Sequence, residues 1–395
     1  MTIADRWLLP DGVEELLPAQ ASQVEALRRK LLDLYRSWGY ELVIPPLVEF
    51  TDSLLVGLDH DVNLQTFKVT DQLSGRTMGI RADITPQTAR MDAHSLKRKG
   101  PCRLCYADSV LHTKPKALLA SRSPIQLGAE FYGDSGLGSD IEVISLMLET
   151  LMCAGLDNIT LDLGHVGIYR ALVEQAGLTP QAEQTLSDAL QRKSTVDIEA
   201  AITDSVSDPS VAQMMRALSQ LNGDRSVLSK AKEVLANAPA AVLEDIDTLQ
   251  QVSNRIASRM PDINIYFDLT ELRGYHYHTG LVFSALAPGH GQAVANGGRY
   301  DDIGEVFGRA RPATGFTTDL KALLKYLPLD QQQAPPFIFA PSSEGLNEAE
   351  DKRLWSAIGQ LRAAGELVVS AVSADCQPPP ASRSLVLKNG EWSVV

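Results

Sequence analysis

The stretch from Arg103 to Gly133 reads RLCYADSVLHTKPKALLASRSPIQLGAEFYG. It predicts two strands joined by a loop, with the first strand carrying Leu111–Lys114 and the second Gln126–Glu130. The polar residues on these predicted strands that could take part in a binding site are His112, Lys114, Gln126 and Glu130.

An amphipathic helix and a short strand are predicted upstream of this stretch. Residues Gln20–Trp38 place apolar side chains at helical spacing along one stripe. Gly39 is typical of a residue that ends a helix. Tyr40–Ile44 then predicts a strand that runs into the dipeptide Pro45–Pro46.

Alternating strand and helix signals continue on both sides of the stretch. Thr77–Arg81 predicts a strand, and Pro86 suits the first turn of the helix that follows. Downstream, Ser139–Glu142 predicts a capping box that opens an apolar helix. Ile159–Leu163 predicts the next strand.

The composition changes between residues 167 and 259, where alanine, leucine, glutamine and glutamate dominate. Strand-like alternation is missing from this part of the sequence, so we predict a helical insertion. Strands are predicted again at Ile263–Asp268 and Tyr277–Ser284, followed by a helix at Leu320–Tyr326.

Residues 330–336 predict a linker between a domain of residues 1–329 and a small domain of residues 337–395. The elements predicted in the small domain are a strand Phe337–Ala340, a helix Asn347–Ala364, a strand Glu366–Val372 and a hairpin that turns at Asn389–Gly390.

Composition limits the classes of function. The chain has 395 residues, with 36 basic and 49 acidic side chains and a formal net charge of −13. That balance argues against a dedicated tRNA binder, which needs a basic surface for phosphates. Neither an apolar run long enough to span a bilayer nor a secretory signal is found, and four cysteines do not form a disulfide framework. We therefore expect a cytoplasmic protein.

Several separated segments resemble, in order, the motifs of class II aminoacyl-tRNA synthetases, with histidyl-tRNA synthetases the most similar. Arg81–Thr85 resembles their Arg-Pro-Glu-Gly-Thr, and Arg103–Gly133 has the outline of motif 2, Phe-Arg-x-Glu followed by Gln-x-x-x-Glu. Leu272–Gly280 is similar to the histidine-specific Arg-Gly-Leu-Asp-Tyr-Tyr-x-Gly. Asn296–Asp301 is similar to Gly-Gly-Arg-Tyr-Asp. The segment around Pro46 resembles motif 1.

The resemblance implies an α+β fold, in which an antiparallel sheet of the class II synthetase type is flanked by helices. It also implies that the helical insertion interrupts this domain, that a small α/β domain follows, and that a homodimer forms through the region near Pro46. A pocket for free histidine is implied at Asp83, Thr85, Gln126, Glu130, Arg273, Tyr275, His278 and Tyr300. Carboxylates and hydroxyls suit an ammonium group, an amide or guanidinium suits a carboxylate, and aromatic side chains suit an imidazole.

The ATP half of the site departs from the synthetase pattern. His112 stands where motif 2 has its ATP-gripping arginine, and Lys114 stands where it has glutamate. Lys321 and Ala322 occupy the positions of the glutamate and arginine that end motif 3. An imidazole replaces a guanidinium poorly, and adenylation needs cations on the phosphates. We therefore expect no catalytic site, no cofactor and no metal in this chain.

A synthetase-like chain with these losses resembles the regulatory subunits of short-form ATP phosphoribosyltransferase, which act at the first step of histidine biosynthesis. That resemblance implies a noncatalytic partner of a separate catalytic subunit, in a hetero-octamer of four regulatory and four catalytic chains. It implies activation of the catalytic subunit and feedback inhibition by histidine as an allosteric ligand.

Other interpretations stay open. One is an atypical histidyl-tRNA synthetase, and another is a free-standing histidine sensor or RNA-binding module derived from a synthetase. Cys102 and Cys105 form a single CxxC in a predicted strand, which favours a structural role. His276 and His278 would face the same side of a strand, but a zinc site needs further ligands.

Overall fold

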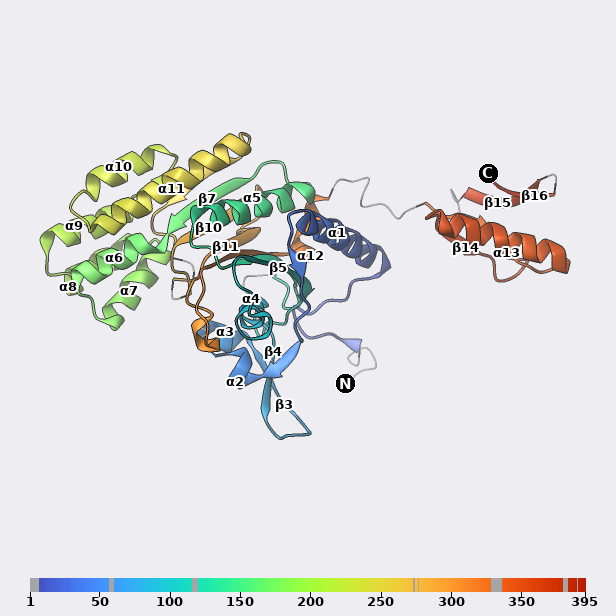
Figure 1. Ribbon diagram of the computed structural model, residues 1–395, viewed down its shortest axis with the longest axis horizontal. Helices are drawn as coiled ribbons and strands as arrows, with labels where there is room; N and C mark the ends of the chain where they lie inside the picture. The colour runs from blue at the N-terminus through green and yellow to red at the C-terminus, as the bar shows by residue number, and fades with distance from the viewer. Residues whose placement is uncertain are drawn as a thin grey trace. The chain divides into compact units, whose positions relative to one another are not determined.

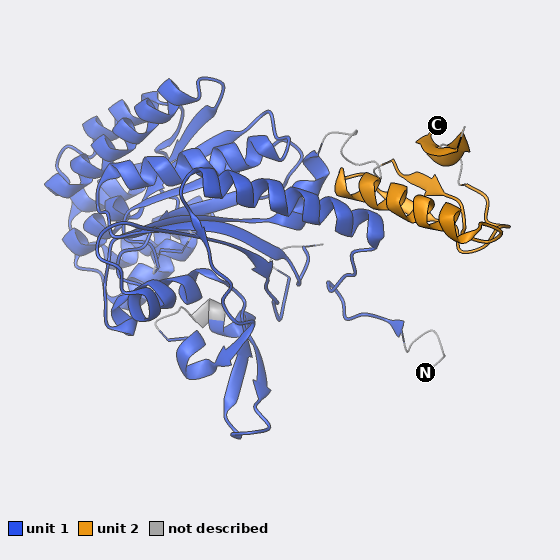
Figure 2. Ribbon diagram, turned by 45° about the vertical axis from the view of Figure 1, so that its right-hand side comes forward, with its two compact units in different colours: residues 1–327 blue, residues 328–395 orange. Residues whose placement is uncertain are grey.

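The computed structural model describes residues 7–56, 60–115, 120–272, 274–275, 277–327, 336–378, 383–388 and 390–395 (Figure 1). The chain separates into two compact units, residues 1–327 and 328–395 (Figure 2). Most of the predicted linker, residues 330–335, lies outside the described residues.

A nine-stranded sheet forms the centre of the first unit (Figure 1). In spatial order its strands are β1 (Glu41–Leu42), β5 (Cys102–Ser109), β6 (Ile125–Tyr132), β12 (Ala313–Asp319), β11 (Ala295–Arg299), β10 (Leu281–Leu286), β7 (Thr160–His165), β9 (Asn264–Asp268) and β8 (Asn222–Gly223). Neighbouring strands are antiparallel, except that β1 is parallel to β5 and β7 to β9. The fold class is α+β, as predicted.

The core lies on one face of this sheet, under α1 (Pro18–Ser37) and α5 (Leu137–Cys153). Successive side chains of a strand point to opposite faces. Leu127 and Ala129 of β6 therefore join the core with Leu31 of α1 and Leu146 of α5, all fully buried. The alternate residues of the same strand, including Glu130, point to the other face.

That other face carries α4 (Thr85–Arg90), which continues as a π-helical turn, Met91–Leu96. Pro86 lies in the first turn of α4, as predicted. A three-stranded sheet leads to this helix, with spatial order β2 (Val48–Phe50), β4 (Thr77–Ile80) and β3 (Phe67–Thr70), accompanied by α2 (Thr51–Leu54) and α3 (His60–Gln65). In Figure 1, α4 and this small sheet lie below the large sheet.

The region between β7 and β9 is helical, which confirms the predicted insertion (Figure 1). Its helices are α6 (Val166–Ala176), α7 (Pro180–Gln191), α8 (Thr195–Ser205), α9 (Pro209–Leu218), α10 (Ser226–Val234) and α11 (Ala240–Arg259). Only the two-residue β8 interrupts them within this range, all of which is described. Among the described residues, no helix is both long and apolar enough to cross a membrane.

The second unit is a small α/β structure around one helix. Its elements are β13 (Ile338–Ala340), α13 (Glu348–Ala363), β14 (Val368–Ser370), β15 (Arg383–Lys388) and β16 (Glu391–Val394), with sheet order β14-β13-β15-β16. Asn347 caps α13 through a capping box with Glu350. The predicted hairpin joins β15 to β16; Asn389 lies outside the described residues, and Gly390 has a φ of 84°.

Three sequence predictions are wrong about where elements begin or end. The first strand of the opening stretch, β5, ends at Ser109, so Leu111–Lys114 follows the strand instead of belonging to it. The strand predicted at Tyr277 begins only at Leu281, because the preceding residues form a turn in which the His278 amide bonds to the Gly274 carbonyl at 2.8 Å.

The capping box predicted at Ser139 is the third. Helix α5 begins two residues earlier, at Leu137, with Gly136 as its N-cap. The Ser139 hydroxyl donates back to the Gly136 carbonyl at 2.8 Å, and Asp140 turns to pair with Arg299 at 2.8 Å. Glu142, the other residue of the predicted box, accepts from Arg103 Nε at 2.7 Å and from Arg103 Nη2 at 2.8 Å, so it does not cap the helix.

Candidate functional site

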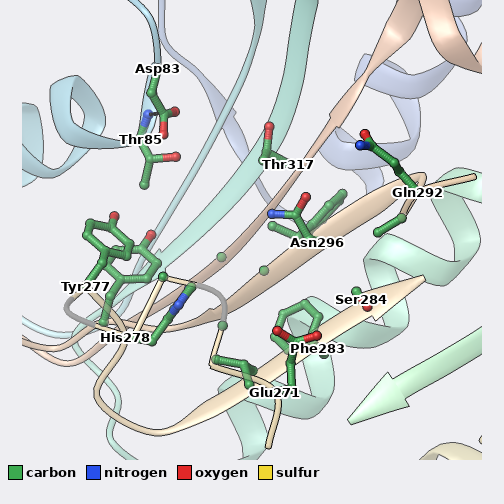
Figure 3. Close-up of a pocket in the computed structure, with 18 of the residues that line it drawn as sticks. Asp83, Thr85, Glu271, Tyr277, His278, Phe283, Ser284, Gln292, Asn296 and Thr317 are labelled. Atoms are coloured by element: carbon green, nitrogen blue, oxygen red, sulfur yellow. Dashed lines mark hydrogen bonds between the residues drawn. The ribbon is translucent and has the colours of Figure 1, made fainter. Parts of the chain in front are cut away.

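A cavity of about 650 Å³ opens on the face of the large sheet opposite α5. Among the predicted site residues, those that line it are Asp83, Thr85, Glu130, His278 and Tyr300. They come from the start of α4, from β6, from the turn before β10 and from the end of β11, which are far apart in the sequence. Figure 3 shows Asp83 and Thr85 on one side of the cavity, with His278 across from them.

Strand register forms the floor of the cavity. Glu130, Gly315, Gly298 and Val282 lie directly opposite one another on β6, β12, β11 and β10. A Cβ atom on Gly315 would lie 1.6 Å from Glu130 Oε2, and one on Gly298 would lie 2.6 Å from His278 Cδ2. These two positions therefore need glycine, because any side chain would occupy the space of a polar group in the site.

Glu130 is buried at the centre of the floor, with 1% of its surface exposed. Its Oε1 accepts hydrogen bonds from Thr85 Oγ1 and Tyr106 OH, both at 2.9 Å, and its Oε2 accepts one from Tyr300 OH. Burial raises the pKa of Glu130 to about 8, although the three hydroxyl groups lower it. Burial therefore favours the protonated, neutral form of this carboxyl at neutral pH.

Gln126 supports the site from behind. Its amide Nε2 donates to Asp83 Oδ1 at 2.7 Å, and its Oε1 accepts from the Ile84 amide at 2.9 Å. Asp83 Oδ1 also accepts from the Thr85 amide at 3.0 Å. Gln126 does not line the cavity, although we predicted a direct contact with ligand; its bonds instead hold Asp83 at the cavity wall.

An aromatic wall stands beside Glu130. The Tyr277 and Tyr300 rings stack with centroids 5.0 Å apart, and the His278 ring meets Tyr277 edge-on at 5.3 Å. We did not predict Tyr277, although its neighbour His278 was a signal that pointed to the same turn. Such a wall can pack against the faces and edges of a small heterocycle.

Tyr275 points away from the cavity, contrary to its predicted role. Its hydroxyl donates to Glu183 Oε1 of α7 at 2.7 Å, and its ring packs edge-on against Tyr169 of α6 at 5.2 Å. Gly274, Tyr275 and Tyr277 have turn geometry, and the resemblance to the histidine-specific motif did not give the direction of the Tyr275 side chain. Arg273 and His276 lie outside the described residues, and their predicted roles stay predictions.

Polar side chains that we did not predict extend the floor. Thr317, Asn296 and Ser284 form the next row on β12, β11 and β10, in direct register. Glu271 also lines the cavity, which gives it three acidic side chains with Asp83 and Glu130 and, among the described lining residues, no lysine or arginine. The site therefore favours a ligand that carries positive charge.

The predicted remnants of an ATP site lie away from this cavity. His112 is buried, and its Nε2 lies 2.9 Å from the Ala82 carbonyl oxygen. Lys114 is exposed, and Ala322 carries no polar group. Lys321 Nζ pairs with Glu14 Oε1 at 3.2 Å. Of the three polar residues at former ATP positions, His112 and Lys321 thus have partners within the chain.

The other candidate sites have structural explanations. Cys102 and Cys105 are buried on β5, and burial raises the pKa of their thiols to about 11 and about 12. Such thiols are poor metal ligands and nucleophiles at neutral pH. Among the described residues, no group of three histidine, cysteine, aspartate or glutamate side chains is arranged to hold a metal ion.

Each of the two units of the chain matches a known protein family. Residues 12–323 match the family model described as histidyl-tRNA synthetase, and residues 335–395 match that of the ATP phosphoribosyltransferase subunit HisZ C-terminal domain. The ATP phosphoribosyltransferase regulatory subunit of Stutzerimonas stutzeri is 55% identical over all of this chain and 99% of its own length. That of Pseudomonas aeruginosa (strain LESB58) is 53% identical over the same shares.

Solved structures show the same fold. The ATP phosphoribosyltransferase regulatory subunit/histidyl-tRNA synthetase from Bacillus halodurans C matches with a TM-score of 0.81 and 26% identity, over 94% of each chain. The histidyl-tRNA synthetase of Nostoc sp. PCC 7120 matches with a TM-score of 0.78 over 96% of this chain and 91% of its own, at 17% identity. The predicted class II synthetase-like fold is confirmed. This chain belongs to the family of ATP phosphoribosyltransferase regulatory subunits.

Proposed function

We propose that this chain is a noncatalytic subunit that binds free histidine in the cavity and passes inhibition to a separate catalytic subunit of ATP phosphoribosyltransferase. The observation that carries the proposal is the convergence of Asp83, Glu130, His278 and Tyr300 on one cavity. The family supports the regulatory role, since its members named above are regulatory subunits of that enzyme.

The cavity offers partners for two of the three polar parts of histidine. Asp83 and the Thr85 hydroxyl suit the ammonium group, because a charged donor needs a charged or strongly polar acceptor when water is excluded. Glu130 can accept from an imidazole N–H, while His278 and Tyr300 enclose the ring. Recognition of the ligand carboxylate by Arg273 remains a prediction.

Adenylation of an amino acid needs cations that stabilise the charge on the phosphates in the transition state. The described residues that line the cavity provide none, and the lysine at the end of motif 3 is paired with Glu14. A chain of this kind can bind histidine without activating it, which supports a role without catalysis.

Regulation requires that histidine bind two states of the assembly with unequal affinity. We propose that the assembly contains a homodimer of this chain formed near Pro46, within four regulatory and four catalytic chains. The exposed apolar side chains beside Pro46 support such a contact, since Leu42, Ile44 and Leu47 are 46%, 72% and 48% exposed. We further propose that this chain activates the catalytic subunit when histidine is absent.

Isothermal titration of the purified chain with histidine tests the binding step. We expect Asp83→Ala to weaken histidine binding by about tenfold or more, because the ligand ammonium loses a charged partner. Lys321→Ala, at a former ATP position away from the cavity, is the matched control and leaves the affinity unchanged. Absence of histidine binding to the unaltered chain, alone and with the catalytic subunit, contradicts the proposal. Co-purification of RNA would then favour a nucleic-acid role.

A further inference from the structure

The helical insertion contacts the turn that carries Tyr277 and His278, two of the three side chains of the aromatic wall. Arg170 of α6 donates from Nη2 to the His278 carbonyl at 3.0 Å and to the Tyr275 carbonyl at 3.3 Å. One guanidinium group therefore spans the backbone on both sides of Tyr277. Because carbonyl hydrogen bonds from a charged donor are strong and directional, this contact fixes the path of the turn.

A second set of contacts anchors the turn through the Tyr275 side chain. Its hydroxyl donates to Glu183 of α7 at 2.7 Å. Its ring centroid lies 5.2 Å from that of Tyr169, with the ring planes at 72°, and 5.3 Å from Cζ of Arg170. Tyr275 as a whole residue is 5% exposed. The Tyr275 side chain thus packs into the insertion and anchors the turn there, which explains why it points away from the cavity.

Hydrogen bonds to other elements fix both ends of the same turn. At the upstream end, Gln191 Nε2 of α7 donates to the Leu272 carbonyl at 3.1 Å. At the downstream end, the Thr279 amide donates to the Arg299 carbonyl of β11 at 2.7 Å. Gly274 has a φ of 63°, and a Cβ atom there would lie 2.8 Å from His278 Nδ1. The turn is therefore a short bridge between insertion and sheet, with the site residues Tyr277 and His278 in its middle.

We propose that the helical insertion is part of the ligand site, with Arg170 and Tyr275 as positioning residues that set histidine affinity through the turn. Neither side chain lines the cavity. Both act by fixing where Tyr277 and His278 stand relative to Glu130. The proposal rests on the proposed function, because it takes histidine as the ligand, and it adds a role for α6 and α7.

A consequence follows from linkage. If Arg170 and Tyr275 favour the turn that binds histidine, then bound histidine must stabilise their contacts with the insertion by the same factor. Ligand binding should therefore slow hydrogen exchange in α6 and α7, although the cavity is lined by none of their residues. A role confined to the stability of the fold does not produce that ligand-dependent change.

The test compares Arg170→Ala and Tyr275→Phe with a matched control in the same insertion. The control is Arg216→Ala, which removes a two-pronged ion pair between α9 and α8, where Arg216 meets Glu199 at 2.7 and 2.8 Å away from the turn. Histidine affinity is measured by isothermal titration. Hydrogen exchange is followed in residues 166–191 and 277–286, with and without histidine, and the melting temperature of each variant is recorded.

We expect Arg170→Ala to weaken histidine binding about 5- to 20-fold and Tyr275→Phe about 3- to 10-fold, as losses of one or two hydrogen bonds imply. Arg216→Ala should bind like the unaltered chain. Histidine should protect residues 166–191 from exchange in the unaltered chain, and less in Arg170→Ala. Equal affinities in all four proteins, or histidine protection confined to the cavity strands, overturn the proposal.

Failure of the proposed function would look different. If the unaltered chain binds no histidine, exchange in residues 277–286 still decides whether Arg170 positions the turn. Faster exchange there in Arg170→Ala than in Arg216→Ala, at equal melting temperature, supports positioning for another ligand. Equal exchange in the two variants refutes it.

Discussion

Glu130 shows how one buried group can control a site. Desolvation alone would disfavour its charge, while the hydroxyls of Thr85, Tyr106 and Tyr300 favour it. The effect of burial is larger than that of the hydroxyl groups, so the pKa of Glu130 is raised to about 8. A cationic ligand would shift that balance toward the carboxylate, so occupancy and protonation of the cavity are coupled.

Glu130 also makes the stability of the protein depend on pH. Its pKa is about 8 in the folded chain against an ordinary value of 4.5, so the folded state holds the extra proton between these values. Stability therefore falls as pH rises from about 4.5 to about 8. We expect Glu130→Gln, which mimics the protonated form, to melt at a higher temperature than the unaltered chain at pH 8.5. The two should melt alike near pH 5; a pH-independent difference in melting temperature would contradict the account.

A substitution at Gly315 tests whether the floor of the cavity needs a residue without a side chain at this position. A Cβ atom at Gly315 would lie 1.6 Å from Glu130 Oε2, so Gly315→Ala should displace the carboxylate and abolish measurable histidine binding. Gly138→Ala is the control, because Gly138 lies in α5 with nothing within 4 Å of its added Cβ. That change should be neutral or stabilising by up to about 1 kcal/mol. Titration and melting curves decide, and tight binding by Gly315→Ala would refute the assigned floor.

Sequence reasoning found the site residues that sit in recognisable motifs and missed those that depend on register. Glu130 and Tyr300 were predicted because motif patterns fix their positions. Ser284 and Asn296 could be found only once the pairing of β10 with β11 was known. Tyr275 was assigned to the cavity because it lies in the segment that resembles the histidine-specific motif, whereas its hydroxyl bonds to Glu183 of the insertion.

At the scale of elements, Arg299 joins β11 to the start of α5. Its guanidinium pairs with Asp140 at 2.8 Å and donates to Ser139 Oγ at 3.0 Å, with both charged side chains nearly buried. The sequence suggested a helix cap at Ser139 because its residue pattern is the same as that of a cap. A local sequence pattern cannot distinguish a serine that caps its own helix from a serine that bonds to a residue of a distant strand, as Ser139 does with Arg299.

Arg299→Met should cost about 3–5 kcal/mol of unfolding free energy, because it leaves the buried Asp140 without its ion-pair partner. Adding Asp140→Leu should recover much of the loss, since the uncompensated charge is then removed. Denaturant unfolding of the single and double variants completes the cycle. Additive losses would show that the two side chains do not act as a pair.

The predicted helices and strands were correct where the hydrophobic periodicity continued over many residues, and they were wrong at the ends of some strands. The insertion between residues 167 and 259 and helix α1 were evident from helical spacing over many residues. The first strand of the opening stretch and the start of β10 were misplaced by residues that form turns. Backbone hydrogen bonds decide those ends, from the Leu111 amide to the distant Arg81 carbonyl at 3.1 Å and from the His278 amide to the nearby Gly274 carbonyl at 2.8 Å.

At the scale of the whole molecule, the chain joins a synthetase-like unit to a small unit that matches the HisZ C-terminal domain family. The described lining residues of the cavity include three acidic side chains and no lysine or arginine, which argues against phosphate as the ligand. Fold and family were recognisable from the order of short motifs. The connection between the cavity and the insertion was not, because it depends on side-chain directions in a turn.

The central claim is that histidine acts through this chain on another subunit. It is tested most directly by the steady-state rate of phosphoribosyl-ATP formation by the short catalytic subunit from the same source, with and without this chain, while histidine is titrated. We predict a higher rate when this chain is added, inhibition by histidine only in its presence, and loss of that inhibition with Asp83→Ala. A rate and a histidine response that are the same with and without this chain would contradict the account.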